Sequence, residues 1–266
     1  QYSARLLPGV SAGVPLVNTA TATASSTAGA NPDERTSYTA NDTSSITPPS
    51  PSITKGVTPS VATIGSDLDY TLLAVDVPAD IETFDMAVID TLPAGLAVES
   101  LIDTQCTTPT GTCIVPTPTV VSGASGNPMV FWFGDLAAST EVRTIRIRYL
   151  ATPTDVPTNV SGTVLTNTAQ IRWNATNALT SAPDPDNLPT FTSTSNVGDA
   201  SVTLREPRLL IDKDVDVVGC NAVANPAAAA TDDDTCSTEA GASYTYTVTV
   251  RNVGDWPAFD ALVTDT

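Results

Sequence analysis

Hydrophobic and polar side chains alternate with a period of two wherever this sequence has a clear pattern. In residues 143–150, Ile145, Ile147 and Tyr149 fall on one face of an extended chain and two arginines fall on the other. In residues 243–251, Tyr and Val alternate strictly with Thr. Thr, Val and Tyr suit a half-buried strand. No stretch of the sequence has a convincing helical period, and 21 Pro and 15 Gly interrupt the chain. The sequence therefore predicts an all-β protein built of antiparallel sandwiches.

Internal repeats indicate how the chain is divided. The segment Pro51–Val57 recurs with an insertion as Pro207–Val215, and Leu165–Ala169 is echoed by Leu16–Ala20. Self-similarity of this kind is typical of tandem repeat architectures.

A longer match fixes the order of the repeats. Residues 75–91 align with residues 250–266 without a gap and are identical at seven positions. We therefore divide the chain into the C-terminal part of one repeat (1–50), a complete sandwich repeat (51–206) and the N-terminal part of a third (207–266). The two partial pieces lack a counterpart of residues 92–143.

Five motifs follow one another along the chain: I-T-K-G-V, I-G-x-D-x-x-Y-T, D-T-L-P-A-G-L, L-T-N-T-A and D-P-D-N. This order resembles the "conserved repeat domain" of prokaryotic surface proteins, a domain of unknown function and the eleventh so numbered. The resemblance implies tandem immunoglobulin-like β-sandwiches in large extracellular and cell-surface proteins of bacteria and archaea. It implies an architecture and no activity.

Charge and composition exclude several classes of function. The formal net charge is −18, which repels nucleic acids and anionic membrane surfaces. The chain has no His, so it cannot hold a Ser-His-Asp or Cys-His nucleophile or an imidazole metal site. No apolar run approaches the length that spans a bilayer, so we expect no membrane insertion in this segment. Because the first residue is Gln1, we expect any signal peptide to have been removed or to lie outside the sequence.

The four cysteines are spaced locally and fit no zinc framework. Cys106 and Cys113 enclose six residues, and Cys220 and Cys236 enclose fifteen. We expect two short-range disulfides, and hence an extracellular or cell-surface location. A reactive thiol is the alternative, but the chain offers no His or nearby Lys to lower a thiol pKa.

Three polar residues occupy positions that the alternation assigns to the apolar face of a strand. Lys55 lies between Ile53 and Val57 at this spacing, and Asp90 and Asn167 have similar aliphatic neighbours. The partial repeats carry the equivalents Lys213, Asp265 and Asn18. The chain has only two lysines, and both occupy this one position of the repeat.

A buried Lys and a buried Asp are costly unless they pair. Burial lowers the pKa of a Lys and raises that of an Asp, which favours a neutral, nucleophilic amine beside a carboxyl that can polarise an amide. With Asn167 against Lys55 and Asp90 beside them, the amine can displace ammonia and form an isopeptide bond. The same cross-link joins a first-strand Lys to a last-strand Asn in pilin-type and collagen-adhesin sandwiches. The alternative is a plain buried Lys–Asp ion pair capped by Asn, with no covalent bond.

Acidic clusters offer a weaker candidate for calcium, which prefers hard oxygen ligands. They are Asp184 and Asp186 in one loop and Asp232, Asp233 and Asp234 in another. Neither cluster matches a D-x-D-x-D-G loop, and acidic turns are commonly just solvated. We expect no other cofactor.

The sequence as a whole favours a structural, non-enzymatic segment of an extracellular stalk, fibre or filament. Its expected partners are adjacent repeats or copies of itself, arranged head to tail. An adhesin or a carbohydrate- or protein-binding module is the first alternative, and an accessory domain of a secreted hydrolase is the second. The half-repeats at the two ends fit either a longer polypeptide or completion by another subunit.

Overall fold

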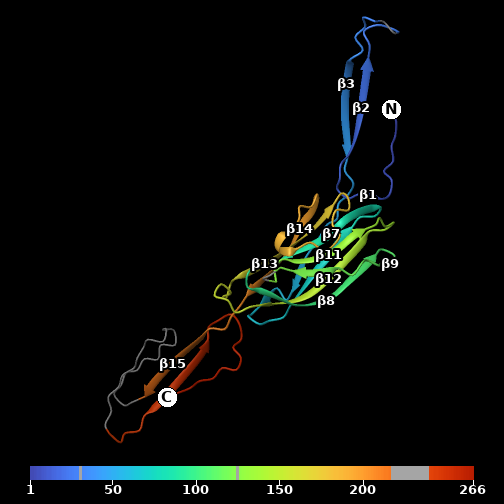
Figure 1. Cartoon of the computed structure of the whole chain (residues 1–266). Helices are drawn as coiled ribbons and strands as arrows, with labels where there is room; N and C mark the ends of the chain where they lie inside the picture. The colour runs from blue at the N-terminus through green and yellow to red at the C-terminus, as the bar shows by residue number, and fades with distance from the viewer. Residues whose placement is uncertain (30–31, 124–125, 217–239) are drawn as a thin grey trace.

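The structure is a computed structural model that describes residues 1–29, 32–123, 126–216 and 240–266. In these residues the chain forms a central two-sheet sandwich with a two-stranded hairpin at each end (Figure 1). The strands are β1 (Val10–Ser11), β2 (Leu16–Ala24), β3 (Tyr38–Ile46), β4 (Gly56–Thr58), β5 (Val61–Ala62), β6 (Leu68–Val77), β7 (Ile81–Thr91), β8 (Leu96–Thr108), β9 (Gly111–Thr112), β10 (Thr119–Ser122), β11 (Met129–Leu136), β12 (Arg143–Pro153), β13 (Val164–Asn174), β14 (Ser193–Leu204), β15 (Leu209–Asp216) and β16 (Thr245–Asn252). The predicted all-β sandwich class is confirmed.

A five-stranded antiparallel sheet forms one layer, in the order β4-β6-β12-β8-β9. In β12 the predicted alternation is complete, because Ile145, Ile147 and Tyr149 are fully buried. The intervening Arg146 and Arg148 lie on the outer face, where they pair with acidic residues.

The opposing sheet has the order β10-β11-β7-β13-β14-β5, with β1 also paired to β7. Its central strands are antiparallel, whereas β1–β7 and β14–β5 are short parallel pairs. The outer face of β7 and β11 is also covered, because Ala87, Ile89 and Val130 pack against Trp132, Leu188 and Phe191. This cover makes β7 a strand buried on both faces.

The segment before Leu16 belongs to the sandwich in space. Val10 of β1 pairs with Ile81 of β7, and Ala12 is fully buried in the core. The indole nitrogen of Trp173 donates a 3.0 Å hydrogen bond to the Ala12 carbonyl. Residues of the predicted first unit (1–50) thus contribute a strand to the sheet of the predicted complete repeat (51–206).

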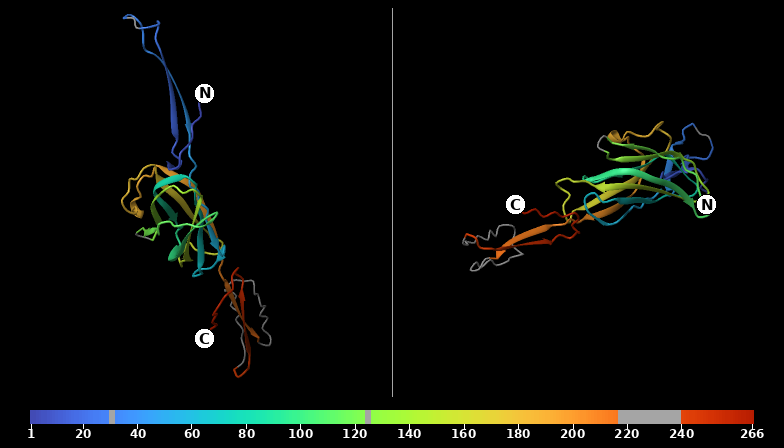
Figure 2. Two further views of the ribbon diagram at one scale, coloured as in Figure 1. Left: turned by 90° about the vertical axis from the view of Figure 1, so that its right-hand side faces the viewer. Right: turned by 90° about the horizontal axis from the view of Figure 1, so that it is seen from below.

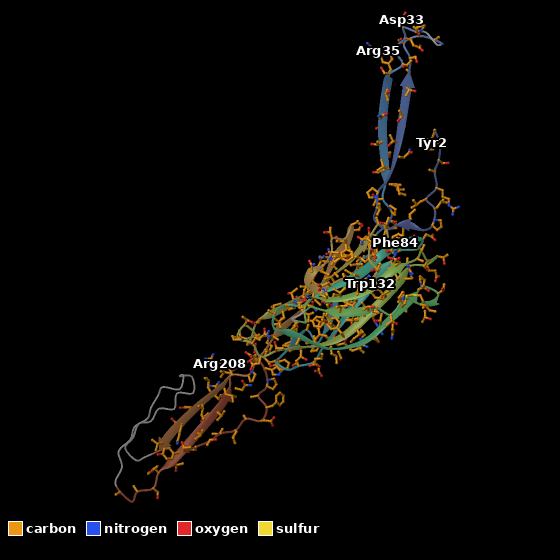
Figure 3. The ribbon with its side chains drawn as sticks, in the orientation of Figure 1. Tyr2, Asp33, Arg35, Phe84, Trp132 and Arg208 are labelled. Atoms are coloured by element: carbon orange, nitrogen blue, oxygen red, sulfur yellow. A yellow bond between two sulfur atoms is a disulfide. The ribbon has the colours of Figure 1, made fainter. Side chains whose placement is uncertain are left out.

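The two terminal hairpins extend away from opposite ends of the sandwich, as two further views show (Figure 2). All residues of β2 and β3 are exposed. Arg208 lies where the second hairpin leaves the sandwich, and Asp33 and Arg35 lie at the far end of the first (Figure 3). Ion pairing of Arg205 with Asp255 helps to hold the second junction.

The predicted Cys106–Cys113 disulfide is present and closes the β8–β9 hairpin, with the Cα atoms 5.1 Å apart. Cys220 and Cys236 lie outside the described residues. Among the residues that the structure describes, no helix has the length and apolar character needed to cross a membrane.

Candidate cross-link site

Lys55 lies immediately before β4, and its side chain is fully buried. The carboxamide of Asn196 on β14 fixes the segment, because it accepts a hydrogen bond from the Ile53 amide (3.1 Å) and donates one to the Ile53 carbonyl (2.7 Å). Gly198 allows the close approach of this segment, because a Cβ there would lie 3.3 Å from the Ile53 carbonyl oxygen. The backbone therefore directs the amine into the core.

Asp90, near the end of β7, receives that amine. The Nζ atom of Lys55 lies 2.6 Å from both carboxylate oxygens of Asp90, and neither side chain is exposed to solvent. On the neighbouring strand Ala169 stands opposite Asp90, which puts Asn167 on the same face at the diagonal position. The three residues predicted from the sequence thus share one region of the core.

Tyr149 on β12, in the five-stranded sheet, connects the three residues. Its hydroxyl donates to Asp90 Oδ2 at 2.8 Å and accepts from Lys55 Nζ at 3.1 Å. Asn167 Nδ2 also donates to this hydroxyl at 2.6 Å, whereas Asn167 Oδ1 is buried without a hydrogen-bond partner. The amine and the carboxamide are therefore held by the same oxygen atom.

Tyr70 completes the surroundings of the amine. Its ring stacks on that of Tyr149, with centroids 5.4 Å apart, and Lys55 Nζ lies 5.3 Å and 5.6 Å from the two ring centroids. The aromatic faces stabilise a cation electrostatically. The hydroxyl of Tyr70 is buried and makes no hydrogen bond.

Burial dominates the protonation of this cluster. It lowers the pKa of Lys55 to about 8, against the opposing effect of the Asp90 charge. Burial also raises the pKa of Asp90, although Lys55, Tyr149 and Asn167 favour its charged form. The pKa of Tyr149 is raised by burial and by the neighbouring Asp90 carboxylate, so its hydroxyl keeps its proton. Both shifts of the Lys–Asp pair favour the neutral forms that an amine–carboxamide reaction requires.

The partial repeats hold their equivalents differently. Lys213 forms an ion pair with Asp265 at 2.5 Å, but the two side chains are 40% and 52% exposed. A hydrogen bond from Lys213 to Asp265 raises the pKa of this lysine, the opposite direction to Lys55. Asn18 is exposed on the other hairpin and donates to the Tyr2 hydroxyl. The structure thus brings Lys213 and Asp265 together, whereas Asn18 lies on β2, whose hairpin extends from the other end of the sandwich (Figure 1).

Sequence reasoning missed Tyr149, Tyr70 and Asn196 as members of the site. Tyr149 had been placed on the apolar face of its strand, and a hydroxyl on such a face needs a partner. Tyr70 stands within the repeated motif, and its counterpart Tyr246 lies under Lys213. Both tyrosines therefore carried a detectable signal, whereas Asn196 did not, because only the packing of β14 brings it to Ile53.

The structure describes one of the two acidic loops that were candidates for calcium binding. Asp184 caps the short 3₁₀ helix η1 (Pro185–Asn187) by accepting a hydrogen bond from the Asp186 amide at 3.0 Å. Within the described ranges no three His, Cys, Asp or Glu side chains are grouped to hold a metal ion. Asp232, Asp233 and Asp234 lie outside the described residues. Calcium binding stays a prediction.

A scan against protein-family models finds no match for this chain, and a search of curated proteins finds none either. Among solved structures, the C-terminal fragment of the major pilin GBS80 of Streptococcus agalactiae is 12% identical, with a TM-score of 0.42 over 62% of this chain and 63% of that one. The major pilin SpaD of Corynebacterium diphtheriae is 14% identical, with a TM-score of 0.39 over 62% and 43%. The collagen-binding subdomain of the Enterococcus faecalis surface protein ACE is also 14% identical, with a TM-score of 0.36 over 57% and 97%. These likenesses carry no weight for function, because each TM-score lies below 0.5.

Proposed function

We propose that this protein is a structural segment of an extracellular stalk, fibre or filament, stabilised by a self-formed isopeptide bond between Lys55 and Asn167. The observation that carries the proposal is the fully buried Lys55–Asp90 pair, bonded through Tyr149 to the Asn167 carboxamide. The reaction occurs once in each molecule, so the protein has no turnover and is not an enzyme.

The reaction needs only groups that the fold supplies. The neutral Nζ of Lys55 attacks Cγ of Asn167, and the C–N bond to Nδ2 then breaks. A proton from the lysine leaves with Nδ2 as ammonia, so the products are one isopeptide bond and one NH₃. Protonated Asp90 donates toward the carboxamide oxygen as negative charge develops there and takes the proton from the attacking amine.

Tyr149 is a positioning residue in this proposal. Its hydroxyl binds both reacting groups and Asp90, and its stacking on Tyr70 fixes the ring. The hydroxyl can also pass a proton between Asp90 and Asn167 Nδ2, since it donates to one and accepts from the other.

The position of the bond explains its structural value. Lys55 precedes an edge strand of the five-stranded sheet, whereas Asn167 lies on β13 in the opposing sheet. A covalent link between them joins the two layers and closes a loop around most of the sandwich. Force applied along a tandem array would then bypass the enclosed strands.

The wider assignment rests on the architecture. We propose that the chain belongs to the conserved repeat domain named above and that neighbouring repeats are its partners. The Cys106–Cys113 disulfide supports an oxidising, extracellular location. The net negative charge of the chain favours solubility in such an array.

Intact mass tests the proposal. After reduction, the purified chain should weigh about 17 Da less than its sequence mass, the loss of one ammonia. A tryptic map should show the peptides of Lys55 and Asn167 joined, and Asn167→Ala should have its full sequence mass. An unlinked Lys55 peptide in the mature wild-type protein would overturn the cross-link.

A further inference from the structure

The C-terminal hairpin repeats the geometry of the opening strands of the sandwich. In the sandwich Val57 stands opposite Tyr70, and in the hairpin Val215 stands opposite Tyr246. Each valine follows its lysine by two residues, so Lys55 and Lys213 occupy the same position. Lys213 Nζ lies 4.5 Å from the ring centroid of Tyr246, as Lys55 lies over Tyr70.

The segment that carries Asp265 shares one backbone feature with β7, although it is not itself a strand. Asp85 and Asp260 each lie five residues before the acidic partner, and both have a left-handed backbone, with φ of 53° and 50°. Lys213 binds one carboxylate oxygen of Asp265, whereas Lys55 binds both carboxylate oxygens of Asp90. Three components of the buried site are therefore already assembled at the second position.

Among the residues that the structure describes, no Asn-bearing strand lies at this second position. In the sandwich, β13 pairs with β7 and covers the Lys–Asp pair. At the hairpin the corresponding surface is open, with Ile211 50%, Tyr244 49% and Val248 36% exposed. An apolar face beside an unpaired strand edge is a typical site for the addition of a strand.

We propose that Lys213, Tyr246 and Asp265 form an acceptor site for an extended strand that carries Asn, with Leu two residues before it and Ala two residues after it. The inference rests on the proposed function, because it takes the repeat as the unit of assembly. The spacing places the three side chains on one face of the incoming strand, with the carboxamide at the Lys–Asp pair and the aliphatic groups on the apolar surface.

The chain shows the chemistry of such a strand twice. In the sandwich it is Leu165–Ala169, whose Asn167 is bound at the site. The same pattern is exposed on β2, where Leu16, Asn18 and Ala20 share one face. The register of that hairpin is also repeated, since Asn18 stands opposite Ser44 as Asn167 stands opposite Ala200. A docked strand of this type would bury Lys213 and allow the same exchange of ammonia for an isopeptide bond.

The probe is a synthetic peptide with the sequence of residues 164–174, incubated with the full 266-residue chain. We expect the dye-labelled peptide to bind, and replacement of its Asn167 by Ala to weaken binding about tenfold, since the buried Lys–Asp pair would lose its partner. We also expect a covalent adduct equal to protein plus peptide minus about 17 Da, mapped to Lys213.

Two protein variants give the controls. Lys213→Met should lose the adduct, whereas Lys55→Met should keep it. Self-association of the chain through Lys213 and Asn18 of a second copy would also support the site. No binding, or equal binding of the Asn and Ala peptides, would overturn it. The same tryptic map reports the Lys55–Asn167 bond, so that bond without peptide capture overturns this inference alone.

Discussion

At the residue scale, one phenol hydroxyl holds the site together. A Lys–Asp pair removed from water gains little net stability unless its remaining hydrogen bonds are satisfied. Here Tyr149 supplies those bonds from the opposing sheet and reaches Asn167 at the same time. Replacing Asp90, replacing Tyr149 and changing the pH should therefore affect the site in different ways.

Asp90→Ala should abolish the cross-link and restore the sequence mass of the chain. It should also lower the free energy of unfolding by about 3–5 kcal/mol, because it leaves the Lys55 amine buried without a counter-ion. Asp103→Ala is the matched control. It breaks a partly exposed pair with Arg146 and should cost no more than about 1 kcal/mol. Mass spectrometry and denaturant unfolding measure the two effects, and equal costs for the two variants would contradict the prediction.

Tyr149→Phe keeps the aromatic packing and removes only the hydroxyl. In chain that is isolated unfolded, before the bond has formed, and then refolded, the loss of about 17 Da should slow by at least about tenfold, because the amine and the carboxamide lose their common partner. Tyr70→Phe provides a control, since the hydroxyl that it removes has no hydrogen-bond partner. If both variants react at the wild-type rate, Tyr149 does not position the reacting groups.

The rate of cross-linking should depend on pH with a maximum. The reactive pair, neutral Lys55 with protonated Asp90, holds one proton and is populated between the raised pKa of Asp90 and the pKa of Lys55, about 8. Below this range both groups are protonated and the amine is not nucleophilic. Above about 8 the coupled pair has lost its remaining proton, so no acid is left to polarise the carboxamide. Time courses of mass loss, recorded as chain isolated unfolded and unreacted is refolded at a series of pH values, test this, and a rate that keeps rising above pH 9 would rule out Asp90 as the acid.

At the scale of elements, β14 holds the backbone segment that carries Lys55. The Asn196 side chain bonds to both the amide and the carbonyl of Ile53. Gly198 has no side chain, so β14 can lie close to residues 53–55. The approach of β14 to residues 53–55 is therefore part of the site, although neither residue touches the amine.

Gly198→Ala should displace the Lys55 segment. A Cβ would lie 3.3–3.4 Å from the backbone of residues 53–55, and backbone cannot give way as a flexible side chain can. We expect a loss of about 1–3 kcal/mol in stability and slower cross-linking. Gly111→Ala is the matched control, since nothing lies within 4 Å of its added Cβ. Thermal unfolding and refolding mass kinetics of the two variants make the comparison, and identical behaviour would refute the positioning role of β14.

At the scale of the whole molecule, the chain is elongated, with a hairpin at each end of one sandwich (Figure 2). The two ends of the sandwich are continuous with these hairpins, so tension enters through the strands near Lys55 and leaves beyond Asn167. Whether the intervening chain carries that tension depends on the proposed bond.

In single-molecule stretching, the cross-link should reduce the extension that the chain gains when it unfolds. The cross-link encloses 112 residue steps (167 − 55 = 112). With the Cys106–Cys113 disulfide reduced, these correspond to roughly 380 Å of extended chain at about 3.4 Å each. The Asp90→Ala variant should release this length on unfolding, and the wild type should not. Equal extensions for the two proteins would show that the enclosed strands are not protected.

The sequence alone determined the class of fold and the polar members of the site. A period of two is imposed by the pleat of a strand, so Ile145, Ile147 and Tyr149 could be assigned to one face without knowledge of their neighbours. The same rule placed Lys55, Asp90 and Asn167 on apolar faces, and the cost of burying unpaired charge predicted that they would meet. Local spacing also sufficed for the Cys106–Cys113 disulfide.

Tertiary structure alone decided the rest. Which strands pair, and which sheet faces which, depends on contacts between residues far apart in the chain, so the meeting of Tyr149 with Asn167 was not visible in either segment. The addition of β1 to β7 has the same origin, because the two residues of Val10–Ser11 are too few to show a period. The burial of the two lysines was also decided by tertiary structure. Lys55 and Lys213 have the same local sequence pattern and each pairs with an Asp. In the part of the chain that the structure describes, only Lys55 is enclosed by a second sheet, and desolvation lowers its pKa whereas the pKa of Lys213 is raised.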